Sequence, residues 1–229
     1  MSSGNLAVFD LDGTITRHDT LAPFLWGYLR RRPWRWPRMV LALPAAARYL
    51  LDRDRGALKG AIIHALLGGV SRHTLERWAR RFVGDLLRDG LYAEALTAIA
   101  RHRERADRLL LMSASTDLYV LLIGRGLDFD EIICTEVRWR ADERLDGRLA
   151  TANCRGEEKR RCLAAVIARD APGSIYAYGD SRADLAHMQL VQHAYLINPS
   201  SRLAARRAPH VQVLHWHQPG GVGTPGNRP

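Results

Sequence analysis

The chain has 229 residues and a mass of 25.8 kDa, with 47% hydrophobic and 25% charged residues, which excludes a small disulfide-stapled fold and a largely disordered chain. Its 34 basic and 24 acidic residues give a formal net charge of +10, which nucleic acid, an anionic membrane or an anionic substrate could each explain. The three cysteines form no CxxC pair, and no basic segment precedes the first apolar run. We therefore expect a cytoplasmic protein without a secretory signal.

Short apolar runs that end in polar residues predict strands at Leu6 to Phe9, Leu109 to Met112, Glu131 to Val137, Ser174 to Tyr178 and Ala194 to Ile197. Segments with helical periodicity lie between them, at Leu91 to Arg105, Asp117 to Gly124, Glu157 to Arg169 and Asp184 to Val191. Strands that alternate with helices predict an α/β fold, a three-layer, Rossmann-like parallel sheet covered by helices on both faces. The sequence LDGRL at residues 145–149 adds a turn signal between two short extended pieces.

Residues 20–90 interrupt this alternation, because they show helical periodicity, several prolines and no convincing strand. We expect them to form an all-helical cap inserted into a catalytic core of residues 1–19 and 91–217. The last residues, 218–229, are so rich in glycine and proline that we expect a disordered tail.

The segment from Leu21 to Leu51 is apolar but is interrupted by arginines and prolines, so it lacks the roughly 20 continuous apolar residues of a membrane-spanning helix. Its tryptophans and arginines suit a headgroup region, which predicts peripheral contact with an anionic membrane, on its inner face. The alternative is that the same aromatic residues pack against the core. Both interpretations stay open at this point.

Polar residues follow the predicted strands where the strands end. Asp10 and Asp12 follow the first strand, Ser113 follows the second, and Asp180 follows a later one. Because ligands bind at the carboxyl ends of parallel strands, we expect these side chains in one pocket. Neighbouring carboxylates need a cation, and their oxygens suit Mg²⁺, with a phosphate as a source of further oxygen ligands.

The residues around these positions fit the same pattern. Gly13 allows a sharp backbone turn, Thr14 offers a hydroxyl, and Lys159 opens a predicted helix from which it could neutralise a phosphate oxygen. Taken alone, the aspartates of DxDGT could instead bond their own backbone in a turn, Asp184 could cap the helix that follows it, and Lys159 could be a solvated helix residue.

Four strings in chain order carry a resemblance to a known family: FDLDGT at Phe9 to Thr14, LLMSAST at Leu110 to Thr116, CRGEEK at Cys154 to Lys159, and YGDSRADL at Tyr178 to Leu185. With them, residues 6–207 resemble the haloacid dehalogenase superfamily, specifically its subclass IB phosphatases with a helical C1 cap, the group that contains phosphoserine phosphatases.

This resemblance implies that Asp10 attacks phosphorus to form an aspartyl-phosphate and that Asp12 is the general acid and base. Ser113 and the backbone N–H of Ala114 would bind the phosphoryl group, and Lys159 would stabilise its charge. It also implies that Mg²⁺ is held by the following groups: the Asp10 carboxylate, the Asp12 backbone carbonyl and the Asp180 carboxylate, with Asp184 as a partner of these ligands.

The substrate is less defined. Asp19 stands where phosphoserine phosphatases have a glutamate for the substrate amino group, and the cap helix that should carry an arginine offers only Lys59. Ala183 replaces an asparagine of those enzymes. We expect Thr14, Asp19 and Ala114 at the substrate, which would be a small phosphorylated metabolite rather than an amino-acid phosphate.

Two alternatives remain for the partner. The cap segment also resembles C-type phosphatidylglycerophosphate phosphatases, which implies a lipid phosphatase at the membrane surface. A protein of another class, a nucleic-acid-binding module, could use Arg30 to Arg38 with Trp34 and Trp36 as stacking residues. Such a module needs no strand-end carboxylates with a matching lysine, so we expect no specific nucleic acid.

Overall fold

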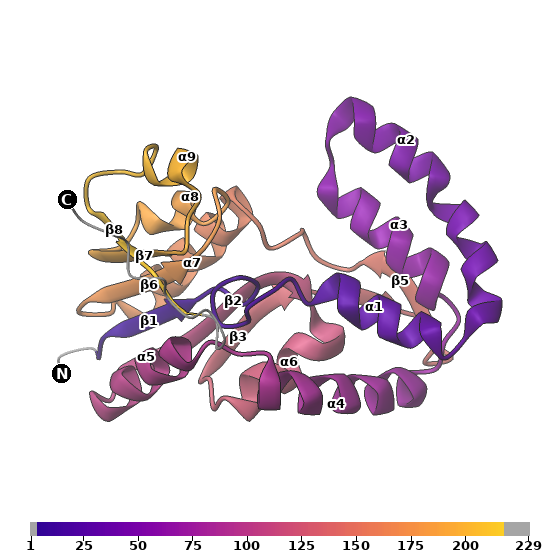
Figure 1. The fold of residues 1–229 in the computed structure, drawn as a ribbon, viewed down its shortest axis with the longest axis horizontal. Helices are drawn as coiled ribbons and strands as arrows, with labels where there is room; N and C mark the ends of the chain where they lie inside the picture. Colours follow the sequence, from indigo (N-terminus) through magenta and orange to yellow (C-terminus); the bar gives the residue numbers. More distant parts are fainter. Residues whose placement is uncertain (1–3, 218–229) are drawn as a thin grey trace, which may run out of the picture.

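The computed structural model describes residues 4–217, and the predicted tail at 218–229 lies outside them. A parallel sheet in the order β3-β2-β1-β6-β7-β8 forms its centre, as Figure 1 shows. The strands are β1 (Leu6–Phe9), β2 (Arg108–Thr116), β3 (Glu131–Thr135), β6 (Ile175–Gly179), β7 (His193–Ile197) and β8 (Val211–Leu214). The predicted α/β fold with a Rossmann-like parallel sheet is confirmed.

The central strand β1 separates two apolar cores, because its side chains alternate between the two faces of the sheet. Ala7 and Phe9 belong to one core, whereas Leu6 and Val8 belong to the other. The first core includes residues of α5 (Ala93–Glu104) and α6 (Asp117–Gly126), and the second includes residues of α7 (Glu157–Asp170) and α8 (Leu185–Met188). The sheet is therefore buried on both faces, as its continuous apolar strands predict.

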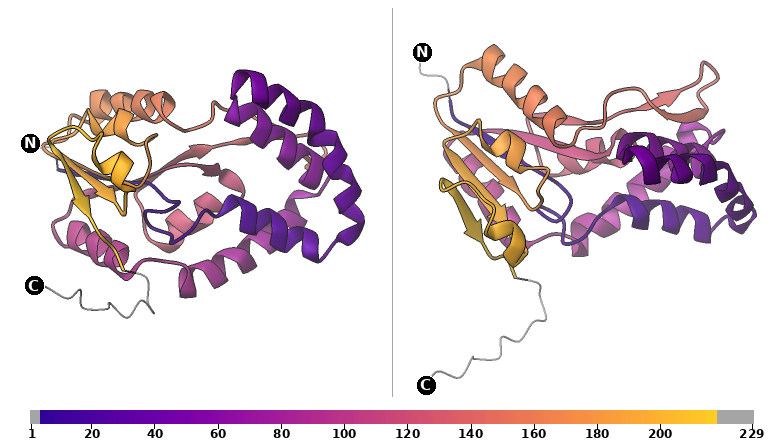
Figure 2. Two further views of the ribbon diagram at one scale, coloured as in Figure 1. Left: turned by 45° about the horizontal axis from the view of Figure 1, so that its top comes forward. Right: turned by 90° about the horizontal axis from the view of Figure 1, so that it is seen from above.

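Residues 20–90, all of which the structure describes, contain helices and no strand. These helices are α1 (Leu21–Arg30), the 3₁₀ helix η1 (Pro33–Ala42), α2 (Leu43–Asp52), α3 (Arg55–Leu67) and α4 (Arg72–Asp89). η1 and α2 pack against α3, and α4 packs against α6 of the core. Figure 2 shows α1 to α3 reaching away from the sheet to one side. Within the described residues no helix is long and apolar enough to cross a membrane, as expected for Leu21 to Leu51.

The turn predicted at LDGRL is wrong, because this segment is itself the strand β5 (Leu145–Leu149). It pairs with β4 (Val137–Trp139) in an antiparallel hairpin whose turn lies at residues 140–144. Gly147 has a φ of +88°, and a Cβ there would lie 2.5 Å from the Cα of His64 in α3. The glycine therefore permits close packing of β5 on α3.

Further details differ from the sequence prediction. β2 continues to Thr116, so Ser113 lies within this strand and does not follow it. The extended run predicted to end at Val137 leaves the large sheet after Thr135. The helix predicted from Asp184 to Val191 is a single turn, α8, and a short additional helix, α9 (Ser201–Ala204), follows β7. The sequence does not predict β8, because Gln212 interrupts its short apolar run, VQVL.

Candidate active site

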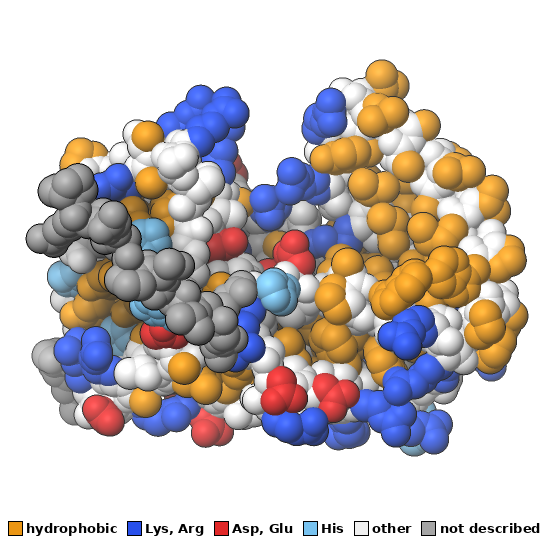
Figure 3. All heavy atoms as spheres, viewed as in Figure 1, with side chains coloured by type: hydrophobic (Ala, Val, Ile, Leu, Met, Phe, Trp, Pro, Cys, Tyr) orange, Lys and Arg blue, Asp and Glu red, His pale blue; other side chains and the backbone are white. Residues whose placement is uncertain are grey.

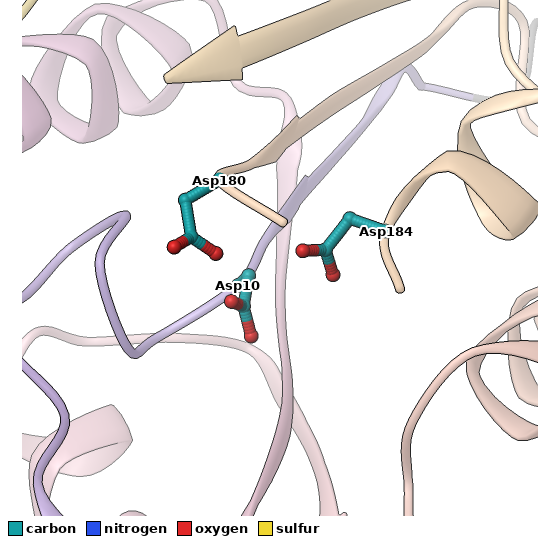
Figure 4. A group of neighbouring side chains, drawn as sticks. All are labelled: Asp10, Asp180 and Asp184. Carbon is teal, nitrogen blue, oxygen red and sulfur yellow. The ribbon is translucent and has the colours of Figure 1, made fainter. Parts of the chain in front are cut away.

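Three aspartates meet at the carboxyl end of the sheet, in the segments that follow two adjacent parallel strands, β1 and β6. Asp10 follows β1, Asp180 follows β6, and Asp184 ends the loop between β6 and α8. One carboxylate oxygen from each lies within 4.8 Å of the others. Figure 4 shows the three carboxylates pointing toward one another.

Lys159, in the first turn of α7, joins two of these carboxylates. Its Nζ donates to Oδ1 of Asp10 at 2.7 Å and to Oδ1 of Asp184 at 2.6 Å, and the residue is only 2% exposed. Burial lowers the pKa of Lys159, but the two carboxylates outweigh that effect and hold it well above its usual range. Lys159 is therefore a buried cation and not the solvated helix residue of the alternative interpretation.

Asp184 is fully engaged by protein groups. Its Oδ1 accepts the Lys159 hydrogen bond, and its Oδ2 accepts from the backbone N–H of Ser181 at 3.1 Å and from Ser181 Oγ at 2.6 Å. Burial raises its pKa, yet the charge of Lys159 overrides this and lowers the pKa to about 2. Asp184 precedes α8 but makes no side-chain capping bond, so its side chain orients Lys159 and Ser181 instead of capping the helix.

Negative charge is in excess at this point. Burial and the neighbouring Asp184 raise the pKa of Asp180 to about 7, and burial together with nearby carboxylates raises the pKa of Asp10 despite Lys159. The backbone N–H of Asp180 bonds its own carboxylate, whereas Lys159 and Ser181 donate to Asp10 and Asp184. Lys159 alone does not balance the three aspartates, so the donor set fits an additional hard cation.

Gly13 sets how closely the first loop approaches Asp180. It has a φ of +77°, and a Cβ at this position would lie 2.3 Å from Oδ2 of Asp180. Both the backbone conformation and the contact require glycine. The backbone of the DxDGT turn therefore lies directly against the side chain of Asp180.

Asp12 is held by three hydrogen bonds. Its Oδ1 accepts from the backbone N–H of Thr20 at 2.7 Å and from Thr20 Oγ1 at 2.6 Å, and its Oδ2 accepts from Ser115 Oγ at 2.6 Å. Burial raises the pKa of Asp12, although these bonds to the charged form oppose the shift. The side chain is therefore fixed in orientation and more easily protonated than an exposed aspartate.

A cavity of about 340 Å³ brings together seven of the nine predicted site residues: Asp10, Asp12, Asp19, Ala114, Lys159, Asp180 and Asp184. Thr14 and Ser113 are fully buried and are not among the residues that line it. Ser113 Oγ accepts from the backbone N–H of Ser115 at 3.0 Å, whereas Thr14 Oγ1 has no hydrogen-bond partner within the described residues.

The cavity is also lined by residues that were not among the predicted site residues, although the resemblance drew attention to Lys59 and Ala183: Leu21, Arg55, Lys59, Ser115, Asn153, Arg155, Ser181 and Ala183. Lys59 reaches it from α3 and donates to Ala114 O and to Asn153 Oδ1, both at 2.6 Å. Burial lowers the pKa of Lys59 to about 8. The sequence pointed to it, since Lys59 is the basic residue in the cap helix where the resemblance leads one to expect an arginine.

Comparisons with known proteins agree with this geometry. Residues 7–189 match the family model of haloacid dehalogenase-like hydrolases. The protein CicA of Caulobacter vibrioides is 36% identical over 181 residues, which cover 78% of this chain and 79% of CicA. A probable phosphatase of Mycobacterium tuberculosis is 28% identical over 207 residues, covering 86% and 70% of the two chains.

Among solved structures, a probable phosphoserine phosphatase from Vibrio cholerae superposes with a TM-score of 0.69 at 13% identity. The superposition covers 96% of this chain and 62% of that one. At this identity the likeness concerns the fold.

Lys159→Met should lower the free energy of unfolding by about 3–5 kcal/mol, because it leaves buried carboxylates without their cation. Urea unfolding in excess chelator measures this change. Adding Asp184→Asn should recover part of the loss, so the two substitutions should couple by about 1–3 kcal/mol.

Arg161→Met is the control for this experiment. It also removes a cation from α7, but Arg161 pairs with Glu158 at the protein surface. It should shift the unfolding midpoint little. Strictly additive effects of Lys159→Met and Asp184→Asn would contradict the buried bridge.

Proposed function

The chain belongs to the haloacid dehalogenase-like hydrolases and is a phosphatase, and we propose that it hydrolyses a small phosphomonoester, with Mg²⁺, through an aspartyl-phosphate on Asp10. The observation that carries this proposal is the buried bridge from Lys159 to Asp10 and Asp184, beside the Asp180 carboxylate. A nucleophilic carboxylate and a fixed cation in one cavity are the elements that phosphoryl transfer needs.

The metal would be held by the oxygens that protein groups leave available. These are Oδ2 of Asp10 and the carboxylate of Asp180, together with the backbone carbonyl of Asp12 as the resemblance implies. When bound, Mg²⁺ supplies positive charge that neutralises the phosphate and orients it toward Asp10. Asp184 is a less suitable ligand, because both of its oxygens already accept hydrogen bonds.

Asp10 is the proposed nucleophile. One of its carboxylate oxygens forms a bond to phosphorus while the ester P–O bond breaks, and the electron pair of that bond leaves with the alcohol oxygen. Asp12, whose pKa burial raises, gives its proton to this leaving oxygen. Asp12 then accepts a proton from the water that attacks phosphorus, and inorganic phosphate leaves Asp10.

The surrounding groups orient these steps. Thr20 and Ser115 hold the Asp12 carboxyl from both sides. Lys159 stabilises the charge on the transferring phosphoryl oxygens from its fixed position against Asp10. Ser113 is proposed to bind the phosphoryl group with the backbone N–H of Ala114. Thr14, which was predicted at the substrate, is buried outside the cavity lining.

The basic residues on the cavity lining indicate which chemical group the substrate bears besides its phosphate. Three cationic side chains lie on the cavity lining: Lys59, Arg55 and Arg155. Apart from the proposed catalytic and metal-binding aspartates, the lining contains one acidic residue, Asp19. We propose that the substrate bears a second anionic group in addition to its phosphate. A lipid phosphate with such a group remains the second candidate, favoured by the exposed apolar surface described below.

Asp10→Asn should lower kcat by at least about 10³-fold, because the amide keeps the shape of the side chain but loses the nucleophile. Release of inorganic phosphate from para-nitrophenyl phosphate with Mg²⁺ measures it, and excess chelator should abolish the activity of the unchanged protein. The control is Asp128→Asn, a surface substitution with 82% of the side chain exposed. Turnover by Asp10→Asn equal to that of the control would refute the mechanism.

Lys59 gives a prediction for pH. With phosphoglycolate, which carries a carboxylate, kcat/KM should fall as the pH rises through about 8, because Lys59 is charged only below that value. Lys59→Met should lower kcat/KM about tenfold or more below pH 8 and remove this fall. Lys59→Arg should keep the activity and also remove the fall, since arginine stays charged.

The matched substrate for this test is para-nitrophenyl phosphate, whose leaving group has no anionic substituent. Its kcat/KM should respond much less to Lys59→Met. Equal losses for both substrates would show that Lys59 does not recognise an anionic group of the substrate.

A further inference from the structure

A large apolar surface lies exposed on α1, η1 and α2. It consists of Trp26, Trp34, Trp36, Met39, Val40, Leu41, Leu43, Leu50 and Leu51, and we call it the cap apolar surface. Trp34 is 70% exposed and Leu51 88%. Figure 3 shows apolar side chains gathered over these helices, on the same face as the hollow where acidic and basic side chains meet. Exposed apolar side chains that gather on one face often mark a site of interaction with a protein or a membrane.

The way in which these helices pack leaves the cap apolar surface exposed to solvent. α2 buries none of its residues, and η1 buries only Ala42. Arg35 donates to Leu66 O at 2.8 Å and to Gly68 O at 2.7 Å, which holds η1 against the end of α3. The prediction that the aromatic residues pack against the core therefore fails for the tryptophans of this surface, although Tyr28 is buried.

Charge indicates which partner fits. Residues 21–51 contain six arginines and no acidic residue. Next to them, Arg31, Arg32, Arg77 and Arg81 line a hollow of about 200 Å³ with no acidic side chain in its lining. Arg31 and Arg32 lie over the rings of Trp78 and Tyr28, at 4.9 and 4.2 Å, so their guanidinium groups are held in place.

We propose that the cap apolar surface and this arginine hollow dock on the surface of an anionic lipid bilayer. Exposed leucines and tryptophans enter the boundary between headgroups and acyl chains, and the arginines of the hollow pair with lipid phosphates. Arg35 is excluded from this role because its donors are used within the fold. The proposal concerns binding and does not depend on the proposed catalytic function.

Sedimentation with vesicles tests the proposal. The full chain should sediment with phosphatidylcholine vesicles that contain phosphatidylglycerol, bind pure phosphatidylcholine much less, and be released by salt. The apolar variant Trp34→Ser with Leu50→Ser and Leu51→Ser should weaken binding at least about tenfold. The charge variant Arg31→Glu with Arg77→Glu should weaken binding to phosphatidylglycerol vesicles by a similar factor.

Leu96→Ser is the matched control, because Leu96 is an exposed leucine of α5, outside the cap. It should bind as the unchanged protein does. Hydrolysis of para-nitrophenyl phosphate by all these variants should stay at the unchanged level, which verifies folding. Its loss in the unchanged protein would count against the proposed function and not against docking.

Two results would overturn the proposal. The first is no sedimentation with phosphatidylglycerol vesicles at low salt, or sedimentation that neither set of substitutions changes. The second is a dimer, seen by analytical ultracentrifugation, that the apolar variant dissociates and that does not bind vesicles. This second result would assign the cap apolar surface to a second copy of the chain.

Discussion

The structure depends most on one buried cation. Lys159 lies between Asp10 and Asp184 with almost no solvent contact, and removing an ammonium group from water costs several kcal/mol unless carboxylates compensate it. Because the two carboxylates come from different segments, this requirement fixes the end of β1, the first turn of α7 and the loop after β6 relative to one another. The same contacts that allow the lysine to be buried also hold the proposed nucleophile, Asp10, and the loop that carries Asp184 in place.

The position of the proposed catalytic residues could be predicted because each of them is tied to a local pattern. The apolar run LAVF ends directly before Asp10, and β1 has the predicted bounds. Parallel strands end at one edge of a sheet, so Asp180 had to lie near Asp10 once both strands were recognised. What could not be derived was that Ser113 is buried behind Ser115, since this depends on how β2 ends.

The contacts of the remaining cavity wall could not be predicted, because they join distant segments; the sequence pointed to Lys59 but not to the residues that it meets. Lys59 meets Ala114 and Asn153 only because α3 folds back over the core. Gly147 illustrates the same limit, since Asp-Gly suggests a turn, whereas the structure uses the glycine for contact between β5 and α3. The sequence could not decide whether Trp34 and Trp36 are exposed, because this depends on which side of η1 faces α3.

The central claim is that phosphate passes through Asp10 as a covalent aspartyl-phosphate. Rapid acid quenching during turnover of para-nitrophenyl phosphate with Mg²⁺, followed by mass spectrometry of the intact chain and of its peptides, tests this claim directly. The account predicts a chain that carries one phosphoryl group, located on the peptide of Asp10 and labile at alkaline pH. Steady turnover with no phosphorylated chain, or a phosphoryl group on a residue other than Asp10, would contradict it.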